Sequence, residues 1–196
     1  AGYLISTSGS GICHAVNRLD RDTSGVVLFA KNSHMKALLS ASLKDERSCK
    51  EYIAVADGVF SPLSGTIDLP IKRLNERDML RITAPDGQRA VTNYVTLCSS
   101  TIGGHAFSVL KLKLETGRTH QIRVHCSSCG HPVVGDALYS TASSEALSGE
   151  LNIHMQALHA YRLSFIEPLT KKELEIVAPV TRSDMLNIIA PLQFEY

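Results

Sequence analysis

The stretch that decides the fold is "HAFSVLKLKLETGRTHQIRVHCSSCGHP", residues 105–132. In its first half, Leu110 and Leu112 alternate with Lys111 and Lys113. Side chains of a strand point to opposite faces in turn, so this alternation predicts a strand with one buried and one wet face.

The second half of the same stretch predicts a helix. Thr119 is placed to cap it, because a threonine oxygen can accept a backbone N–H of the first turn. We expect the helix to carry Ile122, Cys126 and Cys129 inward and to stop at Gly130. The strand would then deliver a charged loop to the start of the helix.

The rest of the chain predicts more short strands, and we expect most of them to pair antiparallel with their neighbours. We therefore predict one α+β domain over residues 1–196, built on a mainly antiparallel mixed sheet flanked by helices. Strands are expected over residues 25–30, before Gly58, on both sides of a turn at 85–87 and on both sides of Pro168; helices are expected after a cap at Asn32 or Ser33 and near residues 183–190; residues 141–150 are expected to be a polar surface insertion.

The composition is that of an ordinary globular chain with little net charge. Of 196 residues, 44% are hydrophobic and 20% are charged, and the formal net charge is +1. A nucleic-acid site must therefore be a local patch rather than a property of the whole chain. No apolar run reaches the roughly 20 residues that cross a bilayer, and the opening residues lack a signal-peptide pattern. We expect no membrane partner and a cytoplasmic location, with an organellar matrix as the alternative.

The five cysteines form an odd set without the spacing of a disulfide framework, as is typical of reduced thiols. Cys126 and Cys129 stand at metal-ligand spacing, with His125 and His131 beside them. A zinc site normally needs a second pair of ligands elsewhere. The sequence shows no such pair, so we predict no metal and interpret these cysteines as buried or half-buried helix residues.

A second stretch, "AVNRLDRDTSGVVLFAKN" (residues 15–32), places charges directly before an apolar run. Alternate side chains of an extended segment point the same way, so Arg18, Asp20 and Asp22 are expected to share one side. Neighbouring positive charge favours the ionised form of a carboxyl group, which suits a nucleophile or a base. An ordinary ion-pair cluster that caps a strand would use the same residues.

Basic residues also gather at the start of the predicted helix. The segment "ETGRTHQIRVH" brings Arg118, His120, Arg123 and His125 to a place where free N–H groups and the helix dipole favour anions. Two basic sites on a nearly neutral domain suggest a bound phosphate backbone. The alternative is a solvated helix face.

These stretches resemble the RluA-type pseudouridine synthases. "VNRLDRDTSG" (16–25) is similar to the family signature, which is His-Arg-Leu-Asp, two variable residues and Thr-Ser-Gly. "CKEYIAVADG" (49–58) is similar to the second motif, in which a lysine precedes a tyrosine that opens a strand ending in glycine. "ETGRTHQIRVHCSSCGHPVVGDALY" (115–139) matches the third motif almost throughout, and "LHAYRLSF" (158–165) is similar to the C-terminal strand.

The resemblance implies the pseudouridine synthase fold and the isomerisation of uridine in an rRNA or tRNA stem-loop, without a cofactor or an obligate protein partner. It implies Asp20 as the catalytic aspartate, Tyr52 as the tyrosine that stacks on the target base, and Arg118 as the basic residue that pairs with the aspartate. Arg18 falls on the arginine that enters the RNA stack where the uridine leaves it. Further RNA contacts are expected at Arg21, Thr23, His120 and Arg123.

Some positions depart from the family pattern. Asn17 replaces the usual histidine, which could weaken a local hydrogen bond, and Glu167 replaces a histidine before Pro168. The family normally has a further strand before the aspartate motif, so we expect this chain to be N-terminally short, and it shows no S4-like RNA-binding module.

Three other functions remain as alternatives. The first is an RNA-binding relative that has lost turnover. The second is a glycoside hydrolase that uses Asp20 and Asp22 as its two carboxylates, although Asp22 lies beside Arg21 and the chain has no tryptophan for a sugar platform. The third is a cysteine hydrolase built on Cys126 and His131.

Overall fold

The computed structural model describes residues 12–76 and 78–192, so the ends of the domain predicted over 1–196 lie outside the described residues. The strands are β1 (His14–Ala15), β2 (Ser24–Gly25), β3 (Phe29–Ala30), β4 (Cys49–Asp57), β5 (Ser64–Asp68), β6 (Ile71–Arg73), β7 (Arg81–Thr83), β8 (Val91–Ile102), β9 (His105–Leu114), β10 (Leu158–Ile166) and β11 (Glu173–Val177). The helices are α1 (Ser33–Ser42), α2 (Gln121–Ser128), α3 (Ala142–Leu151) and α4 (Ser183–Ile189), followed by a 3-10 turn at Ala190–Leu192.

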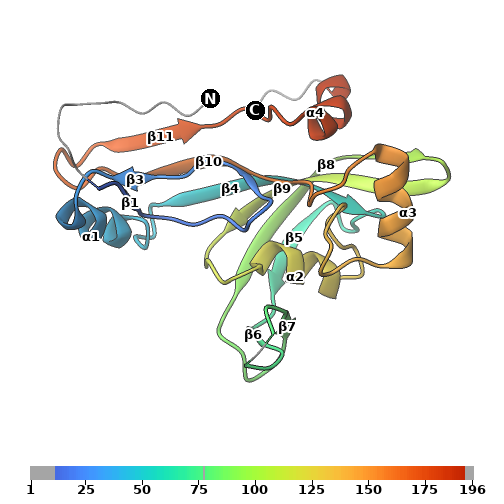
Figure 1. Ribbon diagram of the computed structural model, residues 1–196, viewed down its shortest axis with the longest axis horizontal. Coiled ribbons are helices and arrows are strands. Elements are labelled where there is room, and N and C mark those ends of the chain that lie inside the picture. Colours follow the sequence, from blue (N-terminus) through green and yellow to red (C-terminus); the bar gives the residue numbers. More distant parts are fainter. Residues whose placement is uncertain (1–11, 77, 193–196) are drawn as a thin grey trace.

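One mixed sheet forms the centre of the described chain. Its strands run in the order β11-β10-β4-β9-β8-β5, with every neighbouring pair antiparallel, and β2 pairs with β10 in parallel. Helices α1 and α3 lie toward opposite ends of this sheet (Figure 1). The prediction of a mainly antiparallel α+β domain is therefore confirmed.

Both faces of the sheet are covered at its middle, because successive residues of β4 point to opposite sides. Ile53 packs with Leu147 of α3 and Met185 of α4, whereas Ala54 packs with Ile122 of α2 on the other face. Helix α2 therefore contributes to the core on this second face. This is the helix whose start carries the predicted basic residues.

The segment 105–132 folds as the predicted strand and helix, but the helix begins later than expected. Its cap is His120, which has the left-handed backbone conformation (φ 58°), and Thr119 makes no capping bond. The Gln121 carboxamide oxygen instead accepts the N–H of Arg118 at 2.9 Å and the hydroxyl of Thr116 at 2.8 Å. The loop before α2 is therefore held by the side chain of Gln121, the first residue of the helix. The prediction that Thr119 caps the helix is wrong.

The inner face of α2 is mostly as predicted. Ile122 and Cys126 are buried, and Gly130 (φ 81°) follows the end of the helix. Cys129, however, is exposed, since it caps the helix at the point where the chain turns away from the sheet. Its predicted inward position is wrong.

Residues 25–30 form no continuous buried strand. They contribute to β2 and β3, two-residue strands in different sheets, and Phe29 is 52% exposed. Gly25 (φ 115°) lies so close to β10 that a Cβ atom there would be 2.1 Å from the Ala160 oxygen. The chain touches the main sheet at Gly25 and then leaves it, which an apolar run alone did not reveal.

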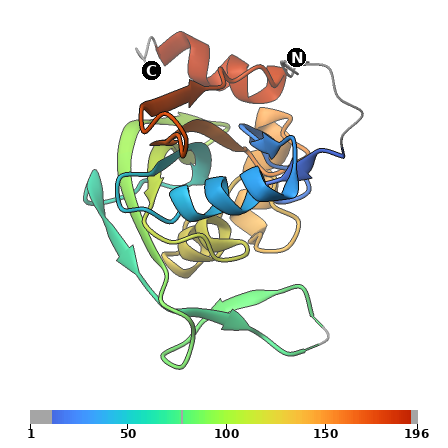
Figure 2. The same ribbon diagram turned by 90° about the vertical axis from the view of Figure 1, so that its left-hand side faces the viewer.

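The two strands on either side of residues 85–87 are β7 and β8, but they do not form a hairpin with each other. Strand β7 pairs with β6, while β8 pairs with β5 and β9. The turn closes through a hydrogen bond from Gly87 N–H to the Ala84 oxygen, and Gln88 then bridges Ile71. The β6–β7 ribbon consequently projects from the body of the domain (Figure 2).

The predicted surface insertion at 141–150 is a helix, α3. Thr141 and Ser144 form a reciprocal capping box, and Leu147 is fully buried in the core. The segment contains few large apolar residues, so its amphipathic pattern was too weak to indicate a helix. The remaining elements agree with prediction: Asn32 caps α1, β10 and β11 flank the turn at Pro168, and the helix expected near residues 183–190 is α4.

Candidate active site

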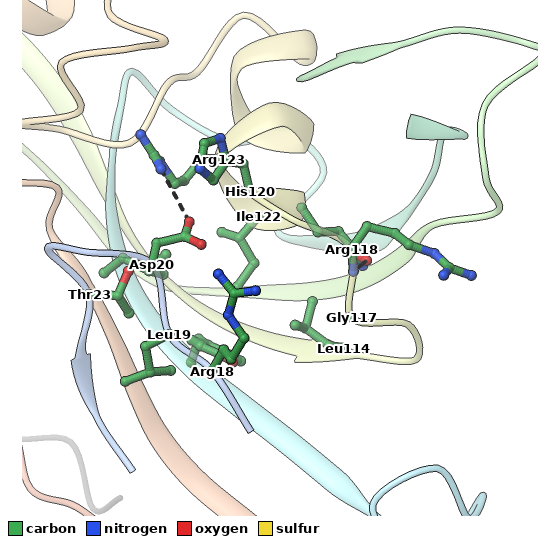
Figure 3. Close-up of a pocket in the computed structure, with 13 residues that line it drawn as sticks. Arg18, Leu19, Asp20, Thr23, Leu114, Gly117, Arg118, His120, Ile122 and Arg123 are labelled. Carbon is green, nitrogen blue, oxygen red and sulfur yellow. Dashed lines mark hydrogen bonds and ion pairs between the residues drawn. The ribbon is translucent and has the colours of Figure 1, made fainter. Parts of the chain in front are cut away.

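A pocket opens where the loop between β1 and β2 meets strands β4, β9 and β10 and the start of α2 (Figure 3). It is lined by Arg18, Leu19, Asp20, Thr23, Tyr52, Leu114, Gly117, Arg118, His120, Gln121, Ile122, Arg123 and Leu158. Segments that are far apart in the sequence thus meet here, and they are the four segments that carried the resemblance.

An ion pair between Asp20 and Arg123 lies at this pocket. Nη1 of Arg123 is 3.2 Å from Oδ2 of Asp20, and the Asp20 side chain remains 24% exposed (Figure 3). A charge-assisted hydrogen bond fixes the orientation of a carboxylate more firmly than a neutral one. Within the described residues, Oδ1 of Asp20 accepts no hydrogen bond, so one oxygen of a held carboxylate is available to a ligand.

Arg123 is itself held on several sides. Its Nε and Nη2 donate to the two oxygens of Asp136 at 2.5 and 2.7 Å, and its guanidinium carbon lies 5.1 Å from the centre of the Tyr139 ring. Burial alone would lower the pKa of Arg123, but its hydrogen bonds to Asp136 and Asp20 and their charges raise it. The guanidinium therefore stays charged, and its third nitrogen is fixed toward Asp20.

Asp136 and Tyr139 were not among the residues predicted for the site. Asp136 is 2% exposed and also accepts backbone N–H groups of Leu138 and Tyr139. Both residues lie within the quoted segment 115–139, and the available signal was a carboxylate two residues after the apolar pair at 133–134, beyond Gly135. A buried carboxylate needs a cation, and the nearest arginine on α2 supplies it.

The predicted pairing of Arg118 with Asp20 is wrong. Arg118 is exposed, its Nε donates to the backbone oxygen of Arg89 at 2.9 Å, and Figure 3 shows its side chain directed away from Asp20. The cause is the late start of α2: the loop ends at His120, so Arg123 rather than Arg118 points back across the pocket. The residue predicted only for RNA contact is the partner of the aspartate.

Tyr52 of β4 lines the pocket, and its stacking on the target base stays a prediction. Burial, with a smaller contribution from the negative charge of Asp20, raises the pKa of Tyr52 to about 12. Its hydroxyl therefore stays protonated at physiological pH. A neutral aromatic side chain next to a carboxylate is suited to contact an uncharged base.

The loop residues divide between the pocket and the solvent. Arg18 and Thr23 line the pocket, and Thr23 accepts a hydrogen bond from Gln156. Arg21 is 91% exposed, pairs with Asp22 at 3.1 Å and does not line the pocket. A turn closed by Thr23 N–H and the Asp20 oxygen breaks the expected alternation, so the prediction that Arg18, Asp20 and Asp22 share one side is wrong for Asp22.

The departures from the family pattern have local structural roles. The Asn17 side chain donates to the Val26 oxygen at 3.2 Å and accepts the Leu28 N–H at 2.7 Å. It therefore ties together the two ends of the loop that carries Asp20. Glu167 accepts backbone N–H groups of Leu169 and Thr170 and shapes the turn between β10 and β11.

The geometry disfavours the hydrolase alternatives. Asp22 pairs with Arg21 outside the pocket lining, so it makes no second carboxylate beside Asp20. Cys126 is completely buried, which raises the pKa of its thiol, and His131 bonds the backbone oxygen of Asp57. Among the described residues, no three His, Cys, Asp or Glu side chains converge on a possible metal position.

Comparison with known proteins identifies the family to which this pocket belongs. The family model described as RNA pseudouridylate synthase matches residues 2–128. This chain belongs to that family. A Bacillus subtilis protein named uncharacterized RNA pseudouridine synthase YjbO is 42% identical over 95% of this chain. Ribosomal large subunit pseudouridine synthase D of Zymomonas mobilis is 37% identical over 95% of this chain. These relatives confirm the RluA-type pseudouridine synthase resemblance.

A solved structure agrees with the fold. Human RNA pseudouridylate synthase domain containing 1 superposes with a TM-score of 0.73 and 27% identity, covering 92% of this chain and 80% of that chain. This pseudouridylate synthase domain spans 62% of the length of YjbO and 58% of the Zymomonas protein. None of its described helices has the length and apolar character needed to span a membrane.

Proposed function

We propose that this domain isomerises uridine in RNA to pseudouridine and that Asp20 acts on the sugar of the target. The observation that carries the proposal is the Asp20 carboxylate held by Arg123 beside Tyr52, in a pocket of a family member. The chain spans only part of its relatives, so its activity is inferred from this site.

The isomerisation requires a carboxylate placed beside the sugar of the target uridine, and no redox equivalent or group donor. The N1–C1′ bond of uridine breaks, the uracil rotates, C5 bonds to C1′, and C5 loses its proton as N1 gains one. Asp20 would serve either by attacking C1′ or by removing the 2′ proton to give a glycal intermediate. Atoms and electrons balance without a redox equivalent or group donor, and we propose no cofactor.

The target must leave its stack before its sugar can reach Asp20. Tyr52 and the apolar side chains of Leu114 and Ile122 offer surfaces for an extruded base. Arg18 is exposed at the pocket, where it can fill the gap left in the RNA. Arg18, Thr23, His120, Arg118 and Arg21 are proposed to contact the RNA, with Arg21 outside the pocket lining.

We propose a structured ribosomal RNA element as the substrate, with a tRNA stem-loop as the second candidate, and a cytoplasmic location. Several relatives are named ribosomal large subunit pseudouridine synthase D, which favours the ribosomal choice. Mapping pseudouridines in total RNA with and without this gene would identify the modified uridine.

Tritium release from RNA labelled at uridine C5 tests the activity, because C5 loses its hydrogen in the reaction. Asp20→Asn should lower the single-turnover rate by about a thousandfold or more while RNA affinity stays nearly constant. The matched control is Asp22→Asn, which removes a carboxylate two residues away that does not line the pocket. Residual activity of Asp20→Asn within tenfold of the parent would remove Asp20 from the central role. If no pseudouridine is lost from total RNA without the gene and the parent releases no tritium, the inactive RNA-binding relative is favoured instead.

A further inference from the structure

Tyr139 connects three parts of the site. Its ring lies against the guanidinium of Arg123, its hydroxyl is 2.9 Å from Nδ1 of His120, and the same hydroxyl accepts the backbone N–H of Arg81 at 3.0 Å. Tyr139 is itself 9% exposed. It thus links α2 to the β6–β7 ribbon beneath the pocket.

These contacts favour one position for the hydrogen of a neutral His120 ring. The Tyr139 oxygen accepts from Arg81, and its own hydrogen has no acceptor among the described residues other than His120 Nδ1. This pattern favours Nδ1 as the acceptor, because the hydroxyl hydrogen then has a partner. A neutral imidazole carries its hydrogen on the other nitrogen in that case, so His120 is the Nε2–H tautomer.

The second nitrogen of His120 is available to the pocket. His120 lines the pocket, and Nε2 has no hydrogen-bond partner within the described residues. Nε2 is also not among the buried side-chain atoms that lack a partner, so it keeps contact with solvent. Figure 3 shows the His120 ring beside Arg123, on the same side of the pocket as Asp20.

The charges around His120 come from four residues: Asp20 in the β1–β2 loop, Arg123 of α2, Arg81 of β7, and Asp136 in the segment after α2. Burial lowers the pKa of His120; Asp20 and Asp136 oppose that shift, and the two arginines add to it. A neutral imidazole is consistent with the hydrogen-bond pattern. A charged one would place a second cation beside Asp20.

We propose that Tyr139 is a positioning residue that holds His120 as its neutral Nε2–H tautomer and so presents a hydrogen-bond donor to the nucleotide in the pocket without adding a second cation beside Asp20. The role of His120 toward RNA rests on the proposed function. The tautomer itself does not, because it is a property of the free protein.

Nitrogen-15 NMR of the histidine rings tests the tautomer without RNA. The His120 signals are assigned by their loss in His120→Asn, a substitution that a left-handed backbone tolerates well. We expect pyridine-like Nδ1, pyrrole-like Nε2 and no titration near the ordinary histidine pKa of about 6.5. In Tyr139→Phe, which lacks the hydroxyl, His120 should titrate closer to that value. A pyrrole-like Nδ1 in the parent protein would overturn the proposal, whether or not the protein turns over any RNA.

Single-turnover rates at saturating RNA test the consequence. Tyr139→Phe should lose activity mainly on the acid side: if its His120 titrates near 6.5, about nine in ten molecules carry the extra cation at pH 5.5, and the defect there should be about tenfold larger than at pH 8. In the His120→Asn background, Tyr139→Phe should have no pH-dependent effect. The matched control is Tyr94→Phe, since Tyr94 is also 9% exposed but bonds the Pro62 oxygen away from the pocket. A Tyr139→Phe defect of equal size at every pH would show a merely structural role and overturn the proposal.

Discussion

The arginines of the Asp20 loop and of the loop and helix that face it differ in what holds them. Arg123 is 4% exposed and is fixed by Asp136, Asp20 and the Tyr139 ring, whereas Arg18, Arg21 and Arg118 are exposed. A buried ion pair loses much when one partner is removed, because the other charge remains unpaired, while an exposed pair contributes little. Arg123 is thus suited to hold the Asp20 carboxylate in place, whereas the exposed arginines can change conformation at little cost.

The largest effect should come from removing the buried arginine. Arg123→Met would leave Asp136 buried without a cation, so we expect a loss of about 3–5 kcal/mol in the free energy of unfolding. The chemical step should also slow by about a hundredfold or more even with saturating RNA, because Asp20 loses its partner. Urea unfolding and single-turnover rates measure the two effects separately.

Two further variants keep this prediction decisive. Arg123→Lys retains a charge that can reach one carboxylate, so it should fold better than Arg123→Met yet remain slow, because lysine cannot bond both Asp136 oxygens and Asp20 in the same fork geometry. Arg118→Met should leave stability and the saturating rate close to those of the parent and weaken RNA binding modestly. A slower chemical step in Arg118→Met than in Arg123→Lys would reverse the assignment.

The difference between these arginines also shows what the sequence could and could not predict. Local pattern predicted the β9–α2 segment, α1 and α4, because alternation and capping are local properties. The family resemblance predicted that Asp20, Tyr52 and the basic loop belong to one site. It misplaced the partner of Asp20, since the side chain that crosses the pocket depends on where α2 begins.

That starting point depends on contacts distant from the cap itself. The Gln121 side chain bonds Val91 and Thr92 of β8 as well as the loop before it, so tertiary packing determines the first residue of α2. The role of Asp136 could not be predicted for the same reason. Its carboxylate is buried beside Arg123 only because the chain after α2 folds back against that helix. The residues of the α3 capping box are visible in the sequence and could have predicted the helix. Its otherwise polar sequence gave no indication that Leu147 is buried in the core.

Arg18 sharpens the comparison between the buried and the exposed arginines. Its removal should lower the rate less than removal of Arg123 does, and by an amount that depends on the structure of the RNA. Arg18→Ala should raise the cost of keeping the target base extruded, with a rate loss of about tenfold on a rigid stem-loop. The defect should shrink on a loosened RNA whose target uridine is already unpaired, because less unstacking is then required. Single-turnover rates on the two RNAs measure this. An equal defect on both would show that Arg18 is only a phosphate contact.

The smallest effect is expected at Arg21, which is 91% exposed, pairs only with the adjacent Asp22 among the described residues and does not line the pocket. If its guanidinium meets one phosphate, Arg21→Ala should weaken RNA binding by about two- to threefold at low salt and reduce the slope of log affinity against log salt by a little under one. The saturating rate and the unfolding free energy should not change, since nothing buried is uncovered.

A matched control is Arg47→Ala, because Arg47 is also an exposed arginine that pairs with a nearby aspartate, Asp45, and does not line the pocket. In a salt series, Arg21→Ala should bind RNA more weakly than the parent at low salt, and Arg47→Ala should bind it as tightly as the parent. An equal loss in both variants would mean that Arg21 acts only through the net charge of the domain, and a loss in the saturating rate of Arg21→Ala would place it with Arg123 rather than with the exposed arginines.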